Sequence, residues 1–147
     1  MSNTKPALVS VGYEGRSIHE FVDVLASRNV DLLVDVRLNA ISRKKGFSKT
    51  ALANALNEQG IEYRHERELG NPKDNREPFR QGLPEARVRY NEHLSNGVAA
   101  TCQKVIELAR ERRVALMCYE LAHEECHRSS IFDQAQKMFP KMEIMKL

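Results

Sequence analysis

Two cysteines, two histidines and an arginine gather within eleven residues near the end of the chain. They are Cys118, His123, Cys126, His127 and Arg128, and the chain of 147 residues has only three cysteines. A cysteine acts as a nucleophile or a metal ligand in its thiolate form, which a helix N-terminus and cationic neighbours favour. We expect Cys126 to lie in the first turn of a helix. The cluster is therefore a candidate thiol site.

Three interpretations of this cluster stay open. The first is a functional thiol or anion site, in which Glu124 and Glu125 oppose a thiolate. The second is structural: Cys118 fills the core, His127 is a hydrogen-bonded core histidine and Arg128 pairs with a carboxylate. The third is a metal site, although the spacing lacks the paired C-x-x-C pattern of ordinary zinc motifs. We expect no metal and no cofactor.

A second group of residues follows the first predicted strand, in the segment GYEGRS at residues 12–17. Its two glycines permit a tight turn, and the next helix presents free N–H groups at its start. An anion would fit there beside Arg16. In the alternative interpretation this is a plain connection in which Tyr13 packs and Ser17 caps the helix. The spacing matches neither a P-loop nor a dinucleotide-binding fingerprint.

A third group follows the second predicted strand, where Asp35 stands in an apolar run just before Arg37. A buried carboxylate needs a partner. Asp35 is therefore either half of a structural pair or the group that aims Arg37 or Arg43 at a substrate anion. Residues 37–57 carry five basic side chains and no acidic one, against a net charge of +3 for the whole chain. This basic loop attracts phosphate or nucleic acid, or simply aids solubility.

Hydrophobic periodicity indicates the elements that position these groups. Strands are expected at residues 7–11, 30–36, 61–64 and 114–118, with an edge strand at 141–147. Helices are expected from the Ser17 capping box to Asn29 and at 49–58, 84–94, 98–112 and 124–139, with Cys102 on the apolar face of the fourth. Residues 66–82 are expected to form a long irregular loop.

Alternating strands and helices predict an α/β fold with a mainly parallel sheet and helices on both faces, in three layers. Ligands of such sheets bind beyond the carboxyl ends of the strands. All three groups of polar residues follow a strand. The pattern therefore predicts one polar, arginine-rich cleft at that edge.

Length and composition set limits on the class of protein. The chain is 41% apolar and 29% charged, which is typical of one globular domain, here residues 1–147. No apolar run is long enough to span a membrane, and residues 1–6 do not have the apolar core of a secretory signal. Three cysteines in a chain of this length indicate reduced thiols and a cytoplasmic location.

Four segments carry a family resemblance: GYEGRS, LLVDVRLNAISRKKGFSK, ERELGNP and CYELAHEECHRSS. In order and spacing they resemble the domain of unknown function 488 family of prokaryotic proteins, from residue 8 to about residue 132. Two prolines usual in the family are absent here, at Asn39-Ala40 and at His123. The DVR segment is also similar to that of rhodanese-like domains, a likeness of fold alone. The resemblance implies that twelve side chains occupy signature positions: Tyr13, Glu14, Arg16, Asp35, Arg37, Ser42, Arg43, Cys118, Glu120, Cys126, His127 and Arg128.

These observations favour an enzyme that acts on an anionic substrate, phosphate-bearing or nucleic acid. The candidate catalytic residues are Cys118, Cys126, His127, Glu120 and Asp35. The candidate anion-binding residues are Tyr13, Glu14, Arg16, Arg37, Ser42, Arg43 and Arg128, and the substitutions Arg37→Ala and Arg128→Ala are each expected to weaken phosphate binding. The alternatives are a non-catalytic nucleic-acid-binding module that uses the basic loop at residues 37–49, and a structural partner-docking domain. No membrane partner is expected.

Overall fold

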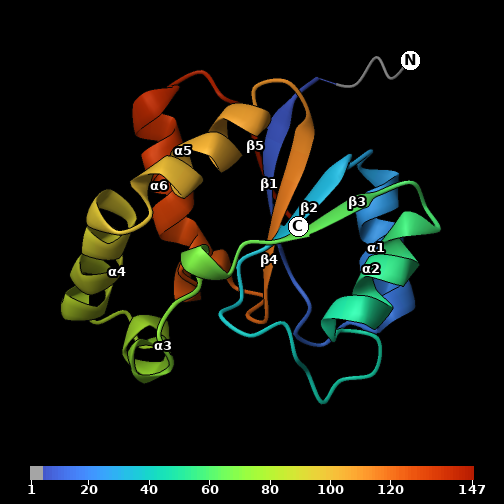
Figure 1. The fold of residues 1–147 in the computed structure, drawn as a ribbon, viewed down its shortest axis with the longest axis horizontal. Helices are drawn as coiled ribbons and strands as arrows, with labels where there is room; N and C mark the ends of the chain where they lie inside the picture. The colour runs from blue at the N-terminus through green and yellow to red at the C-terminus, as the bar shows by residue number, and fades with distance from the viewer. Residues whose placement is uncertain (1–4) are drawn as a thin grey trace.

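The computed structural model describes residues 5–147, and at its centre lies one sheet of five parallel strands (Figure 1). The order across the sheet is β3-β2-β4-β1-β5. The strands are β1 (Ala7–Gly12), β2 (Leu32–Asp35), β3 (Glu62–His65), β4 (Arg113–Cys118) and β5 (Ile144–Lys146). Every residue of β1 and β2 is buried, as expected for parallel strands covered on both faces. The α/β prediction is confirmed.

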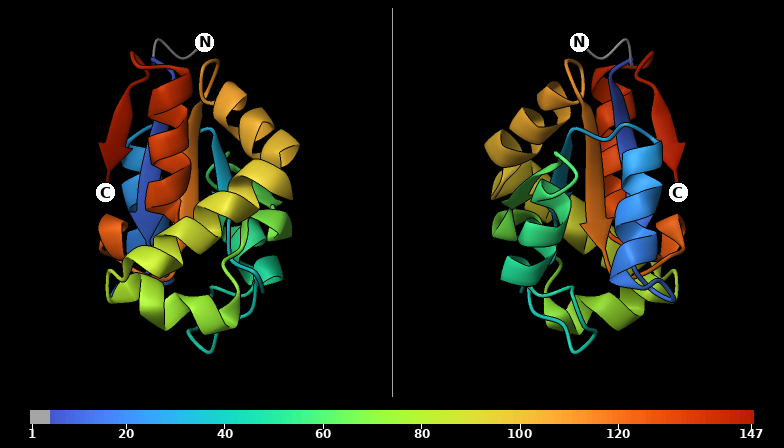
Figure 2. Two further views of the ribbon diagram at one scale, coloured as in Figure 1. Left: turned by 90° about the vertical axis from the view of Figure 1, so that its left-hand side faces the viewer. Right: turned by 90° about the vertical axis from the view of Figure 1, so that its right-hand side faces the viewer.

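Helices cover both faces of this sheet, which gives the three expected layers (Figures 1 and 2). One face packs against α1 (Ile18–Ser27) and α2 (Lys49–Asn57). The other face is covered by α3 (Lys73–Arg80), α4 (Pro84–Asn96), α5 (Ala99–Leu108) and α6 (Arg128–Met138). No helix within residues 5–147 combines the length and the apolar character that a membrane crossing requires.

Local signals explain most of the helix boundaries. The Ser17 hydroxyl accepts a hydrogen bond from the Glu20 N–H, and the Glu20 carboxylate accepts one from the Ser17 N–H, which completes the expected capping box. Asn29, at φ 56°, supplies the left-handed residue that follows α1. Ser48 precedes α2 but does not cap it. Its hydroxyl accepts from the Ser42 N–H instead and so closes the basic loop.

Two parts of the expected pattern are wrong. Residues 66–82 are not an irregular loop, because they contain the 3₁₀ helix η1 (Arg67–Leu69) and α3, whose inner face buries Asn75 and Phe79. The last helix begins at Arg128 rather than at residue 124. A separate 3₁₀ helix, η2 (His123–Glu125), comes first, and Cys126 follows it in extended conformation. Cys126 therefore lies before α6 and not in its first turn.

Parallel register brings three strand ends to the same level. Gly12 at the end of β1 pairs with Cys118 at the end of β4, and Asp35 at the end of β2 pairs with Met117. Gly12 has no side chain where the returning loop passes, since a Cβ there would collide with the backbone of Glu120. The loops that follow β1, β2 and β4 consequently converge on one edge of the sheet.

Candidate functional site

A small pocket opens at this edge of the sheet, with a volume of about 100 Å³. Its walls come from the loops after β1, β2 and β4 and from the segment that joins η1 to α3. Six of the twelve sequence-predicted side chains line it: Tyr13, Arg37, Cys118, Glu120, Cys126 and His127. A pocket therefore lies at the carboxyl ends of the strands, where the sequence predicts a polar cleft, and the chemical roles of its residues stay predictions.

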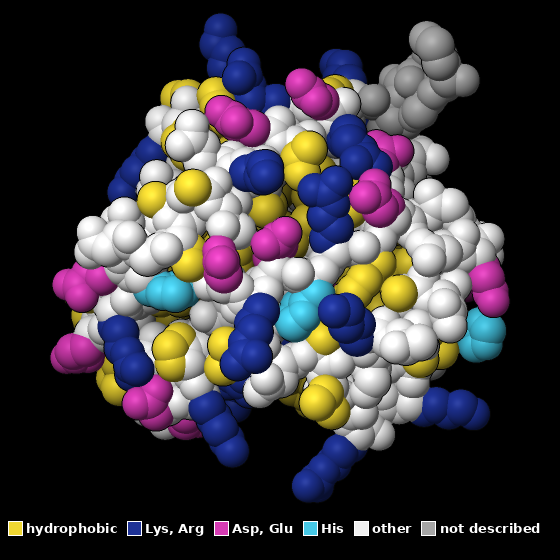
Figure 3. Space-filling model, viewed as in Figure 1, with side chains coloured by type: hydrophobic (Ala, Val, Ile, Leu, Met, Phe, Trp, Pro, Cys, Tyr) yellow, Lys and Arg dark blue, Asp and Glu magenta, His cyan; other side chains and the backbone are white. Residues whose placement is uncertain are grey.

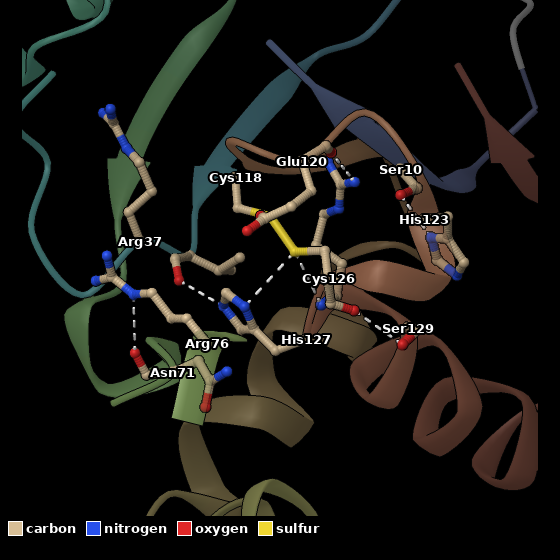
Figure 4. Close-up of a disulfide and its surroundings, with 12 residues drawn as sticks. Ser10, Arg37, Asn71, Arg76, Cys118, Glu120, His123, Cys126, His127 and Ser129 are labelled. Carbon is tan, nitrogen blue, oxygen red and sulfur yellow. Dashed lines mark hydrogen bonds between the residues drawn. A yellow bond between two sulfur atoms is a disulfide. The ribbon is translucent and has the colours of Figure 1, made fainter. Parts of the chain in front are cut away.

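A disulfide between Cys118 and Cys126 forms part of the pocket wall (Figure 4). Both residues are buried. The expectation of reduced thiols is therefore wrong for these two cysteines. The short turn of η2 brings the chain back toward the end of β4. The spacing of eight residues between the two cysteines does not predict this turn. Cys102 remains a free thiol inside α5, where burial raises its pKa to about 11.

His127 holds a fixed orientation beside Cys126. Its Nε2 lies 2.8 Å from the carbonyl oxygen of Val36, and its Nδ1 lies 3.5 Å from Cys126 Sγ (Figure 4). A carbonyl oxygen only accepts, so Nε2 carries the proton and Nδ1 presents its lone pair to the sulfur. Burial lowers the pKa of His127 to about 4, although the Val36 hydrogen bond opposes that shift. The ring is neutral at pH 7.

The two sulfurs have different surroundings. The backbone N–H of Arg128, at the start of α6, lies 3.5 Å from Cys126 Sγ and would stabilise negative charge there. Cys118 Sγ lies 3.3 Å from Oε2 of Glu120, a carboxylate whose other oxygen accepts a 2.8 Å hydrogen bond from Arg80. Negative charge beside Cys118 disfavours a thiolate. Cys126 Sγ therefore receives a backbone N–H, whereas Cys118 Sγ faces a carboxylate.

Asp35 does not reach the pocket but holds Arg37 in its wall. The carboxylate is fully buried and accepts hydrogen bonds from the guanidinium at 2.7 and 2.9 Å, and another from Tyr63 at 2.6 Å. Burial alone would lower the pKa of Arg37, but its hydrogen bonds to Asp35 and the charge of that carboxylate raise it overall. Arg37 also donates to the Tyr13 hydroxyl at 3.3 Å. Its geometry is thereby fixed.

The side chain of Arg128 is fully buried. Its guanidinium donates to the carbonyl oxygens of Val11 and Glu120, so it ties the end of β1 to the loop that follows β4. Burial lowers its pKa to about 10. Arg128 does not line the pocket, and its anion-binding role stays a prediction. The sequence does not show whether a basic side chain faces a cleft or a backbone carbonyl.

Several other predicted residues stay outside the pocket. The Glu14 carboxylate accepts from the Leu121 N–H at 3.0 Å, and Arg16 donates to the Gly12 carbonyl at 3.2 Å. Glu14 joins two loops, whereas the Arg16 hydrogen bond stays within the connection between β1 and α1. Ser42 accepts from the Lys44 N–H within the basic loop, and Arg43 is exposed. These four side chains support the rim or extend into solvent.

Arg76 and Asn71 line the pocket and were missed by sequence reasoning. Arg76 Nε donates to the Asn71 carbonyl at 3.5 Å, and no carboxylate within residues 5–147 forms an ion pair with its guanidinium. Asn71 belongs to the family-like segment ERELGNP, and this membership is the sequence signal that could have identified it. Arg76 follows in a stretch expected to be irregular, so nothing indicated its direction.

His123 is buried beside the site and makes stability depend on pH. Its Nδ1 and the Ser10 hydroxyl lie 2.6 Å apart, and its ring packs edge-on against Phe132. Burial chiefly lowers the pKa of His123 to about 4. The charged groups near it are Lys146, Arg128 and Arg87, which lower the pKa further, and Glu124, which raises it.

Acidification should therefore destabilise the protein by about 1–3 kcal/mol through His123. The unfolded chain binds a proton at this residue below about pH 6.5, whereas the native state does so only below about pH 4. Between these values the unfolded state holds more protons, so stability falls as the pH falls. Urea unfolding at pH 7 and 4.5 should show a smaller loss in His123→Gln than in the parent. The exposed His19→Gln serves as control, and equal losses in all three proteins would contradict the assignment.

The candidate site is thus a pocket at the carboxyl ends of a parallel sheet, with a disulfide in its wall. A family model described as "Domain of unknown function DUF488" matches residues 17–135, and the chain belongs to this family. The match takes in the DVR, ERELGNP and CYELAHEECHRSS segments, but it begins at the last residue of GYEGRS. No curated protein and no solved structure gives a significant match.

Proposed function

We propose that this protein is an enzyme in which the Cys126 thiolate attacks an anionic substrate bound in the pocket. The observation that carries the proposal is the 3.5 Å approach of the His127 Nδ1 lone pair to Cys126 Sγ. A cysteine paired with an oriented histidine is a recurring arrangement for nucleophilic catalysis. The disulfide to Cys118 is then the oxidised form, which a dithiol reductant opens.

The chemical step uses groups already in place. After reduction, the Cys126 S–H proton moves to His127 Nδ1, and the thiolate sulfur forms a bond to the electrophilic atom of the substrate. The bond to the leaving group breaks, and the leaving group departs with its electron pair and accepts the proton from Nδ1. His127 thus acts first as base and then as acid. Cys118, held as a thiol by Glu120, forms the wall of the site.

Two arginines, Arg37 and Arg76, support an anionic substrate, phosphate-bearing in the first instance, although Glu120 and Glu125 also line the pocket. Arg37 is locked by Asp35, yet the guanidinium retains N–H groups that its protein partners do not use. Arg76 adds a positive charge without an ion-pair partner in the described part of the chain. Planar guanidinium groups bind carboxylate and phosphate oxygens in pairs.

Alkylation of the reduced, chelator-treated protein tests this proposal. At pH 7, iodoacetamide should modify Cys126 at least about tenfold faster than Cys118, and His127→Gln should remove most of that advantage. Peptide mass spectrometry gives the rate for each cysteine, with buried Cys102 as the slow internal reference. Faster reaction at Cys118, or an unchanged rate in His127→Gln, would refute the proposed roles.

The same measurement with an anionic reagent reports on the arginines. The rate ratio of iodoacetate to iodoacetamide at Cys126 should fall about 3- to 10-fold in Arg76→Met, because one nearby positive charge is lost. Arg89→Met makes the same change in charge on α4, where Arg89 pairs with Asp74 away from the pocket. Its ratio should match the parent. A fall in both variants would show only a general effect of net charge.

Nucleic-acid binding is a prediction that rests on the loop between β2 and α2. Arg43 and Lys45 are exposed there and Lys49 is exposed at the start of α2, and Lys and Arg side chains project from the lower margin of the molecule where this loop lies (Figure 3). Lys44 is turned inward, since its Nζ donates to the Tyr13 carbonyl at 3.0 Å. A phosphate on a polynucleotide and one on a small molecule suit the pocket equally, so this loop would extend a binding site rather than replace it.

A further inference from the structure

We propose that the reduced protein binds one zinc ion through Cys118 Sγ, Cys126 Sγ and His127 Nδ1, with the fourth ligand position open to the pocket. This inference concerns the same cluster but does not depend on the proposed activity. A zinc ion on Cys126 would block its attack, so the metal-loaded and metal-free proteins are distinct forms.

The first support is the position of the three ligand atoms. They lie within 4.8 Å of one another. Tetrahedral zinc, with Zn–S of ~2.3 Å and Zn–N of ~2.0 Å, sets its ligand atoms roughly 3.5–3.8 Å apart. The distance from Cys126 Sγ to His127 Nδ1 is 3.5 Å. Once reduction breaks the disulfide, the two sulfurs are free to separate to the spacing that zinc requires.

The second support is the orientation of His127. A histidine that binds a metal through one nitrogen typically donates its other N–H to a carbonyl or carboxylate, which fixes the ring and its tautomer. The 2.8 Å hydrogen bond from Nε2 to the Val36 carbonyl is such a contact. It leaves the Nδ1 lone pair directed at the sulfurs before any metal arrives.

The third support is charge. The three residues are buried, and an uncompensated ion is costly in such a place. Two thiolates and a neutral imidazole balance the charge of Zn²⁺, and the two thiol protons are released on binding. The Glu120 carboxylate, 3.3 Å from Cys118 Sγ, lies outside this balance and has its own partner in Arg80.

The fourth support is the opening of the cluster to the pocket, which Cys118, Cys126 and His127 all line. Structural zinc sites use four protein ligands, whereas three protein ligands and one open position are typical of catalytic zinc. Water or an anionic oxygen held near Arg37 and Arg76 would complete the coordination sphere. The ligand spacing in sequence is unlike that of zinc fingers because η2, not a tight hairpin, brings the cysteines together.

Cobalt and zinc titrations of the reduced full-length protein under anaerobic conditions test this inference. One equivalent of Co²⁺ should produce a thiolate-to-cobalt charge-transfer band and the intense visible bands of a tetrahedral site, and one equivalent of Zn²⁺ should displace it. Cys118→Ser, Cys126→Ser and His127→Gln should each weaken zinc binding at least about 100-fold. Cys102→Ser, a change of the same kind away from the cluster, should bind normally. Azide should shift the visible bands if the fourth position is open.

Zinc should also protect Cys118 and Cys126 of the parent protein from alkylation. Because this test needs no variant, its result does not depend on whether a substitution disturbs folding. A reduced parent that gives no charge-transfer band while both thiols react freely would overturn the inference. Visible bands unchanged by azide would overturn the open position. Because the alkylation test of the proposed enzyme uses chelator-treated protein and the metal test uses no substrate, either proposal can fail while the other stands.

Discussion

Arg128→Ala should destabilise the native protein by about 3–5 kcal/mol, one of the largest effects expected of any single substitution in this chain. The side chain is fully buried, and its guanidinium donates to the carbonyl oxygens of Val11 and Glu120. Alanine leaves the buried Val11 carbonyl and the partly buried Glu120 carbonyl without these donors, at up to about 1–3 kcal/mol each, and it opens a cavity as well. The end of β1 and the loop that follows β4 would lose their common anchor.

Urea unfolding of the disulfide-bonded protein measures this loss. Arg128→Lys retains the charge but lacks the planar guanidinium that donates to both carbonyls. It should therefore recover less than half of the lost stability. Arg89→Ala removes an exposed arginine from α4 and should change stability by less than about 0.5 kcal/mol. A fully folded Arg128→Ala protein that lost only its affinity for anions would support the sequence-based prediction and exclude the structural role.

Most of the fold could be predicted because most elements carry their own local signal. The apolar runs at the centres of β2 and β4 exclude half-exposed strands, and the alternation of these runs with helical periodicity leaves few topologies. The Ser17 capping box likewise identified the start of α1. The segment before α4 lacked such a signal, because α3 is short and polar and contains Pro78. Its helical turns depend on burying Phe79 against α4, which is a tertiary contact.

The site could be predicted in location but not in detail. The rule that ligands bind at strand carboxyl ends correctly grouped Tyr13, Arg37, Cys118 and His127 around one pocket. Residue type did not show which side chain faces the pocket and which faces a backbone carbonyl. Arg37 lines the pocket, whereas Arg128 donates to two backbone carbonyls. The disulfide was also beyond sequence reasoning, since it depends on the path of the loop that contains η2.

Asp35→Asn should likewise cost about 3–5 kcal/mol, because it breaks a buried ion pair and leaves the Arg37 guanidinium without a counter-charge. The hydrogen bond from Tyr63 to the Asp35 carboxylate adds to this loss of stability. Burial and the neighbouring Asp35 raise its pKa well above the ordinary value, so its hydroxyl remains protonated and donates to the carboxylate. The measurement is the free energy of unfolding in urea at pH 7. Tyr63→Phe removes one hydrogen bond but no charge, and it should cost only about 1 kcal/mol.

A second readout separates support of the fold from support of the pocket. Since Asp35 accepts two hydrogen bonds from one edge of the Arg37 guanidinium, the folded fraction of Asp35→Asn should also show a reduced iodoacetate-to-iodoacetamide ratio at Cys126. Tyr63→Phe leaves the ion pair intact and should retain the parent ratio. If Asp35→Asn lost stability but kept the ratio, Arg37 would be a structural residue, and the preference for anions would rest on Arg76 alone.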